Sequence, residues 1–197
     1  MNLTFTGSAL SWSHRGHVLA VDVHAPVGGP STPDGPLVEW EALARYLGSG
    51  ADGARALLVA GDGGLDAGLC WSSLSGHAET AYSGLPAFVA RFGAAGRLSQ
   101  IVDRVTAVWR AVDAFGAPSV VVVAGACVRG GLDIVGTADE VVAERRPGLD
   151  DRLRVAGVTV SRWVAPGYGR TTALAMLGSA QPSSMGFGVA HASRQSV

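Results

Sequence analysis

Cysteine and charged residues are scarce in this chain of 197 residues, which has two cysteines and 16% charged residues. Two cysteines, Cys70 and Cys127, cannot build a disulfide framework or a cysteine metal site, and they fit a reducing compartment. A formal net charge of −1 gives no reason to expect nucleic acid or an anionic membrane as a partner. No apolar run approaches the roughly 18 residues that span a bilayer, and the N-terminus does not resemble a signal peptide. We therefore expect a soluble, cytoplasmic protein.

Hydrophobic residues are plentiful at 48%, and the length suits a single globular domain over residues 1–197. Apolar runs bounded by Gly or Pro predict buried strands, and apolar stripes at helical spacing predict helices. We expect strands over 17–24, 54–60, 119–123, 140–144 and 155–160, a hairpin partner over 3–12, and helices over 37–47, 96–115, 130–137 and 170–177. This alternation predicts an α/β fold with a mostly parallel sheet, whose ligands gather at the carboxyl ends of the strands.

Two glycine-rich turns, 61–68 and 125–131, each directly follow a predicted buried strand. If those strands are parallel neighbours, the turns meet on one side of the sheet. Glycines allow a close backbone approach, and the first amides of a helix that begins at Gly130 suit a developing negative charge. Asp133 follows about one helical turn later. The arrangement predicts an oxyanion site with a carboxylate beside it.

Five segments, in order, resemble the motifs of the crotonase (enoyl-CoA hydratase/isomerase) superfamily. They are GLDAGLC (64–70), PSVVVVAGACVRGGLD (118–133), TADEVVAE (137–144), APGYGRTTALAMLG (165–178) and SSMGFGVAHA (183–192). Five motifs in the order of the family make the resemblance specific. The resemblance implies a crotonase-like ββα core with a mostly parallel sheet and a short C-terminus that lacks the family's usual terminal helices.

The resemblance also implies roles for individual residues. Family enzymes polarise a coenzyme A thioester carbonyl with two backbone amides, which map to Leu69 and Gly130. One such donor is worth about 3–4 kcal/mol. The first catalytic Glu of the hydratases maps to Asp133, a shorter carboxylate suited to moving a proton beside the carbonyl. The resemblance assigns CoA-binding positions to Ala25, Ala67 and Arg129, and implies no cofactor apart from the coenzyme A of the substrate.

Several positions depart from the family pattern. Cys70 stands where the family has Asp, and Arg129 replaces the first of three glycines. No acid lies in the segment 153–159, where the second catalytic Glu is expected, although Asp150 and Asp151 lie a little earlier. Ordinary hydration with two Glu residues is therefore not expected.

In size and overall pattern the chain resembles the auxiliary enoyl-CoA hydratase-like proteins of 3,5-dihydroxyphenylglycine biosynthesis. These act beside a type III polyketide synthase and are linked to dehydration and aromatisation of a polyketide-derived thioester to 3,5-dihydroxyphenylacetyl-CoA. The resemblance implies an acyl-CoA substrate, an oligomer, and a type III polyketide synthase or other crotonase subunits as partners. The alternative is a non-catalytic crotonase-like protein that binds and stimulates a synthase.

Simpler explanations exist for several of these residues. Asp133 could only favour the helix dipole, and Arg129 could form a surface ion pair rather than contact a CoA phosphate. Cys127 suits a small buried residue better than a nucleophile, since no motif ties a His to it. His17 and His24 lie an odd number of residues apart near one strand, so the sequence does not favour a metal site there.

Overall fold

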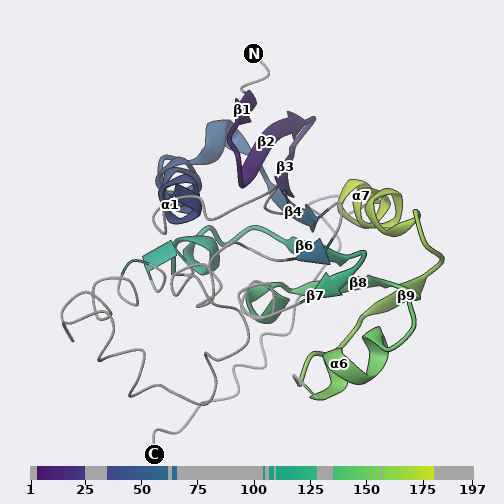
Figure 1. Cartoon of the computed structure of the whole chain (residues 1–197). Coiled ribbons are helices and arrows are strands. Elements are labelled where there is room, and N and C mark those ends of the chain that lie inside the picture. The colour runs from purple at the N-terminus through teal and green to yellow at the C-terminus, as the bar shows by residue number, and fades with distance from the viewer. Residues whose placement is uncertain are drawn as a thin grey trace, which may run out of the picture.

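The computed structural model describes part of the chain, the residues 4–24, 35–61, 64–65, 104, 107–108, 110–127, 135–155 and 157–179. Those residues form a mixed α/β fold with helices packed around one large sheet (Figure 1). None of the described helices is long and apolar enough to cross a membrane.

The described residues form a seven-stranded sheet in the order β1-β2-β3-β4-β6-β8-β9. The strands are β1 (Thr4–Thr6), β2 (Leu10–Arg15), β3 (Val18–Val23), β4 (Ala56–Gly61), β6 (Ser119–Val123), β8 (Glu140–Glu144) and β9 (Arg162–Val164). The first three strands pair antiparallel, and every pairing from β3 to β9 is parallel. The predicted fold class, α/β with a mostly parallel sheet, is confirmed.

Helices cover the two faces of the sheet because the side chains of each central strand alternate between them. Leu57 and Val59 of β4 share a core with α1 (Gly35–Gly48). Leu58 and Ala60 point the other way, into a second core with α7 (Gly169–Ser179). Figure 1 shows α1 and α7 at separate places beside the sheet. Both faces of the central strands are therefore buried.

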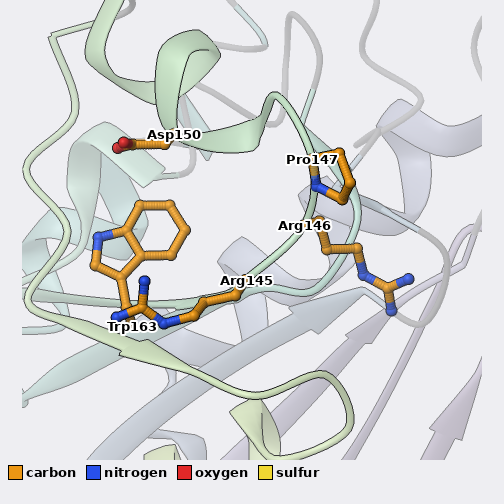
Figure 2. A pocket seen from close by; sticks show the side chains of 5 residues that line it. All are labelled: Arg145, Arg146, Pro147, Asp150 and Trp163. Carbon is orange, nitrogen blue, oxygen red and sulfur yellow. The ribbon is translucent and has the colours of Figure 1, made fainter.

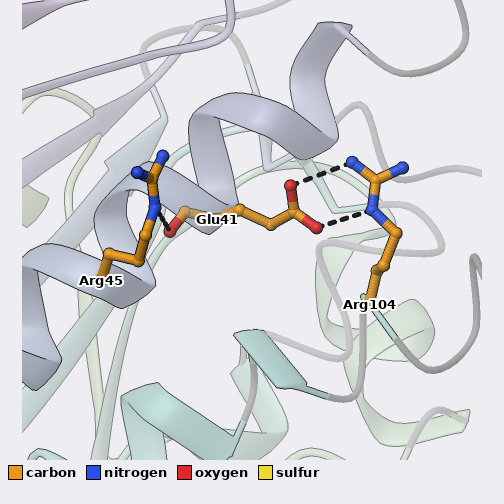
Figure 3. Close-up of polar contacts among 3 residues, drawn as sticks. All are labelled: Glu41, Arg45 and Arg104. Atoms are coloured by element: carbon orange, nitrogen blue, oxygen red, sulfur yellow. Dashed lines mark hydrogen bonds and ion pairs between the residues drawn. The ribbon is translucent and has the colours of Figure 1, made fainter.

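Helix α1 follows the predicted apolar stripe, with Leu37, Trp40 and Leu47 almost fully buried. It ends at Gly48, and Gly50 beyond it has a left-handed φ of 94° that favours glycine. Its exposed side carries Glu41, which accepts two hydrogen bonds from Arg104, at 2.6 Å to Nε and 2.9 Å to Nη2 (Figure 3). These hydrogen bonds and the Arg104 charge hold the pKa of Glu41 below its usual value despite partial burial.

The bidentate pair in Figure 3 connects α1 to the chain segment that leads into β6. Residues 104, 107–108 and 110–114 are helical, which agrees with the corresponding part of the predicted helix 96–115. Val108 is buried in the α1 core and Val112 packs against it, as the predicted stripe requires.

The predicted hairpin between 3–12 and 17–24 is partly wrong. Among the described strands, the hairpin partner of β3 is β2, which extends to Arg15, and β1 pairs with β2 alone. The chain reverses direction at residues 7–9, where Glu39 of α1 accepts backbone hydrogen bonds from Ser8, Ala9 and Leu10, each 2.8 Å long.

The predicted strand over 155–160 is also wrong. The helix α6 (Leu149–Val155) occupies its beginning, and the strand lies later, at β9. Leu149 and Leu153 are one helical turn apart and both buried, while acidic residues begin the helix and basic residues end it. Gly157, with φ of 72°, then donates to the carbonyl of Arg154 and closes the helix.

Candidate functional site

The candidate site lies at the carboxyl ends of the parallel strands β4 and β6, which are hydrogen-bonded neighbours. Their register pairs Val59 with Val121 and Ala60 with Val122, so the two strands end at the same level. The glycine-rich segments that follow them therefore leave the sheet from the same edge. This edge is where ligands of parallel sheets bind.

Beyond that edge the two glycine-rich segments pair with each other. The short strand β5 (Gly64–Leu65) lies parallel to β7 (Ala126–Cys127), with Gly64 opposite Ala126 and Leu65 opposite Cys127. In the described residues this pair forms a second, two-stranded sheet. The prediction that the two turns meet on one side of the main sheet is confirmed.

The residues assigned to catalysis and CoA binding lie outside the described residues. They are Asp133, Leu69, Gly130, Ala25, Ala67 and Arg129. Leu69 follows β5 in the sequence, and Gly130 and Asp133 follow β7. Their roles remain predictions, whereas the pairing of the strands that precede them is observed.

A buried carboxylate at the carboxyl end of β8 was not predicted. Glu144 is 4% exposed, and its Oε1 accepts backbone hydrogen bonds from Gly167 at 2.9 Å and Gly169 at 3.2 Å. Its Oε2 lies 3.4 Å from Nη2 of Arg146. A carboxylate here satisfies the free amides at the start of α7 and favours the positive end of the helix dipole. Glu144 is thus a positioning residue for α7.

The first residues of α7 are fitted closely against the sheet. A Cβ added to Gly169 would lie 2.6 Å from Cγ1 of Val122, so only glycine fits without a shift. The next residue, Arg170, forms an ion pair with Asp22 near the carboxyl end of β3. The sequence alone explained this segment as turn chemistry. The structure adds a close approach and an ion pair to that explanation.

A cavity of about 300 Å³ opens at the carboxyl end of β8 (Figure 2). Of the described residues, Arg145, Arg146, Pro147, Asp150 and Trp163 line it. Arg145 follows β8 directly, Trp163 lies on the neighbouring strand β9, and Asp150 belongs to the first turn of α6. Helix α6 in turn lies close to β7. Helix α6 therefore borders both the cavity and β7, one of the paired glycine-rich segments.

Metal binding has no support in the described ranges, where no group of His, Cys, Asp and Glu side chains is arranged to hold an ion. The histidines that flank β3 have other contacts. His17 Nε2 lies 3.3 Å from the carbonyl oxygen of Leu177, and His24 Nε2 lies 3.0 Å from Oγ of Ser11.

Comparison with solved structures shows which known fold this architecture matches. An enoyl-CoA hydratase/carnitine racemase from Magnetospirillum magneticum aligns over 89% of this chain and 74% of its own, with a TM-score of 0.58 and 15% identity. The chain has the crotonase fold.

Two further crotonase-fold structures agree. Pseudomonas aeruginosa DspI has a TM-score of 0.56 and 18% identity, covering 88% of this chain and 75% of its own. An enoyl-CoA hydratase from Mycobacterium smegmatis has a TM-score of 0.56 and 17% identity, covering 86% and 75%. No family model and no curated protein matches the sequence. At these identities the likeness establishes the crotonase fold alone.

Proposed function

We propose that this crotonase-fold protein is an enzyme that acts on a coenzyme A thioester, in the manner of an enoyl-CoA hydratase, dehydratase or isomerase. The observation that carries the proposal is the pairing of β5 with β7 beyond the carboxyl ends of β4 and β6. This pairing brings together the two glycine-rich segments whose sequences resemble the oxyanion-hole motifs of the family. The structural neighbours named enoyl-CoA hydratase support the same class.

In the proposed reaction, the backbone amides of Leu69 and Gly130 donate to the thioester oxygen and stabilise the enolate. Asp133 removes the proton from the carbon next to the carbonyl, so the C–H electron pair enters the enolate. When the enolate collapses, a C=C bond forms and the β-hydroxyl leaves with the proton returned by Asp133, as water. One acid is enough for this dehydration, and in an isomerisation it would return the proton to another carbon.

The narrower proposal is formation of 3,5-dihydroxyphenylacetyl-CoA from a polyketide-derived thioester, beside a type III polyketide synthase. It is supported by Asp133, the one acid of the motif segment 118–133, and by the overall resemblance. Elimination of water followed by enolisation makes the ring aromatic, so enolate stabilisation and one proton shuttle are the main requirements.

Asp133→Asn tests the proposed proton transfer. A positioned acid/base group contributes about 10²–10⁴-fold, so we expect kcat for thioester dehydration to fall by at least that lower factor. Asp113→Asn is the matched control, because Asp113 is exposed and precedes β6, away from its carboxyl end. Full turnover by Asp133→Asn on a substrate that the wild type converts would show that Asp133 has no such role.

The second candidate function is a non-catalytic crotonase-fold partner of a synthase. Two observations favour it: Cys70 replaces an acid of the family pattern, and residues 153–159 contain no acid. The two functions separate in one comparison. Stimulation of a co-purified synthase that survives Asp133→Ala supports the partner function. Turnover that depends on Asp133, with no association between the proteins, supports the enzyme.

A further inference from the structure

The cavity next to α6 carries two charged side chains that the rest of the described structure leaves without a partner. Within the described residues, neither the guanidinium of Arg145 nor the carboxylate of Asp150 has a hydrogen-bond or ion-pair partner. Both groups nevertheless line the same cavity, together with the half-buried Trp163. A hydrogen-bond donor, an acceptor and an aromatic face thus converge on one space.

The orientation of the side chains singles out Arg145 as the cation of this cavity. Figure 2 shows the guanidinium of Arg145 and the carboxylate of Asp150 both on the side of Trp163, whereas Arg146 is turned away. Arg146 is engaged elsewhere, since its Nη2 lies 3.4 Å from Oε2 of the buried Glu144. Arg145 is fixed at its backbone, where its N–H donates to the carbonyl of Val164 at 2.8 Å.

The position of the cavity indicates which part of a CoA thioester it would meet. Asp150 lies on α6, and α6 lies close to β7, which precedes the proposed oxyanion donor Gly130 in the chain. The chain of the acyl group is bonded directly to the thioester carbonyl carbon, whereas the nucleotide lies at the far end of the pantetheine arm. A cavity bordered by α6, which also lies close to β7, therefore suits the acyl chain better than the nucleotide.

Resting on the proposed function, we infer that this cavity receives the acyl group of the substrate and selects a planar, oxygenated one. A flat unsaturated group stacks on the indole of Trp163. Arg145 donates to an oxygen of that group, and Asp150 accepts a hydrogen bond from one of its hydroxyls. A saturated alkyl chain offers no hydrogen bond to Arg145 or Asp150, yet it displaces the water that hydrates them. The cavity therefore selects against fatty acyl groups. A volume of about 300 Å³ is at the small end of ligand sites and suits a single ring.

The test is calorimetric titration of the wild type, Arg145→Met and Arg152→Met with four ligands. They are 3,5-dihydroxyphenylacetyl-CoA, phenylacetyl-CoA, butyryl-CoA and free CoA. Arg152 is the matched control because it is exposed on the same helix as Asp150 but does not line the cavity. We expect the wild type and Arg152→Met to prefer the dihydroxyphenyl thioester over the phenyl thioester by about 10-fold, which Arg145→Met loses.

A second readout locates the ligand independently of affinity. The indole N–H resonance that disappears in Trp163→Phe identifies Trp163, and we expect it to shift with the dihydroxyphenyl thioester but not with free CoA. If thioesters bind but this resonance is unmoved and Arg145→Met keeps the preference, the inference is wrong and the proposed function stands. An equal loss for free CoA in Arg145→Met would place the nucleotide in the cavity and also overturn it. Binding of none of the thioesters would instead contradict the proposed function itself.

Discussion

Gly169, the first residue of α7, lies so close to β6 that even one added methyl group has no room. A Cβ there would lie 2.6 Å from Cγ1 of Val122 and 3.2 Å from Oε1 of Glu144. Carbon atoms in contact are normally about 3.5–4.0 Å apart, so the helix must move by about 1 Å. Inserting a group into such a packed place costs about 1–3 kcal/mol. We therefore expect Gly169→Ala to lower the free energy of unfolding by that amount.

Gly178 near the other end of α7 is the matched control. A Cβ there would meet no atom within 4 Å, so Gly178→Ala should raise the free energy of unfolding by about 0.5–1 kcal/mol. Urea unfolding followed by circular dichroism compares both variants with the wild type. Val122→Ala removes the atom in the way, and the double variant should recover about 1 kcal/mol relative to the sum of the single changes. A Gly169→Ala variant as stable as the wild type would refute the packing of α7 on β6.

Three further predictions concern single carboxylates and one tyrosine. Glu144→Gln should lower the free energy of unfolding by about 1–2 kcal/mol through loss of its charge-assisted hydrogen bonds, whereas Glu140→Gln at the other end of β8 should change it by less than about 0.5 kcal/mol in the same urea assay. Burial raises the pKa of Glu39, but the four hydrogen bonds that it accepts from Ser8, Ala9 and Leu10 together lower the pKa by more. The net pKa of Glu39 is therefore below its usual value. The stability that Glu39 contributes is then present above the unfolded-state pKa of about 4.3 and is lost as the pH falls through the folded-state pKa. In urea unfolding, the wild type should be more stable than Glu39→Gln near neutral pH, and this difference should vanish on acidification. An advantage that persists at low pH would contradict this. Burial and the Asp52 carboxylate raise the pKa of Tyr46 to about 12. An absorbance titration of tyrosinate should therefore show a transition near pH 12 that is absent in Tyr46→Phe. In Asp52→Asn the same transition should move toward about pH 10. Because this pKa is raised, the associated stability is present below about pH 10 and is lost as the pH rises through the folded-state value.

The central strands could be predicted from the sequence because both their faces are buried. Segments 119–123 and 140–144 agree with β6 and β8, and each is rich in valine between Gly, Pro or charged residues. Burial on both faces leaves a short continuous apolar run, and β4 (Ala56–Gly61) shows the same pattern. The order of strands and helices then predicted the parallel sheet and the meeting of the two glycine-rich turns.

The segment around α6 was mispredicted because strand formation depends on a partner. Residues 155–160 are rich in β-branched residues, yet β8 pairs with residues 162–164 instead. The spacing of Leu149 and Leu153, with acids before and arginines after, was a helix signal available in the sequence. It was weak because the helix is short, and tertiary packing decides such cases.

The buried Glu144 could not be found from local patterns. Its hydrogen-bond partners, Gly167 and Gly169, lie more than 20 positions along the chain, beyond α6 and β9. The PGYG sequence predicts a turn, but it gives no sign that the carboxylate of Glu144 packs against that turn. The cavity residues Arg145 and Trp163 are separated in the same way and meet only because β8 and β9 pair. The order of the strands was enough to predict the meeting of the two turns, whereas Glu144 and the cavity depend on tertiary contacts between distant residues.

The most direct measurement is the affinity of the purified protein for a CoA thioester compared with the matching thioether, which lacks only the carbonyl oxygen. Calorimetry with phenylacetyl-CoA and phenethyl-CoA makes this comparison at equal size. If the amides after β5 and β7 hold that oxygen, two hydrogen bonds are at stake, and the thioester should bind about 10-fold more tightly. Equal affinities would contradict an oxyanion site between the two glycine-rich segments.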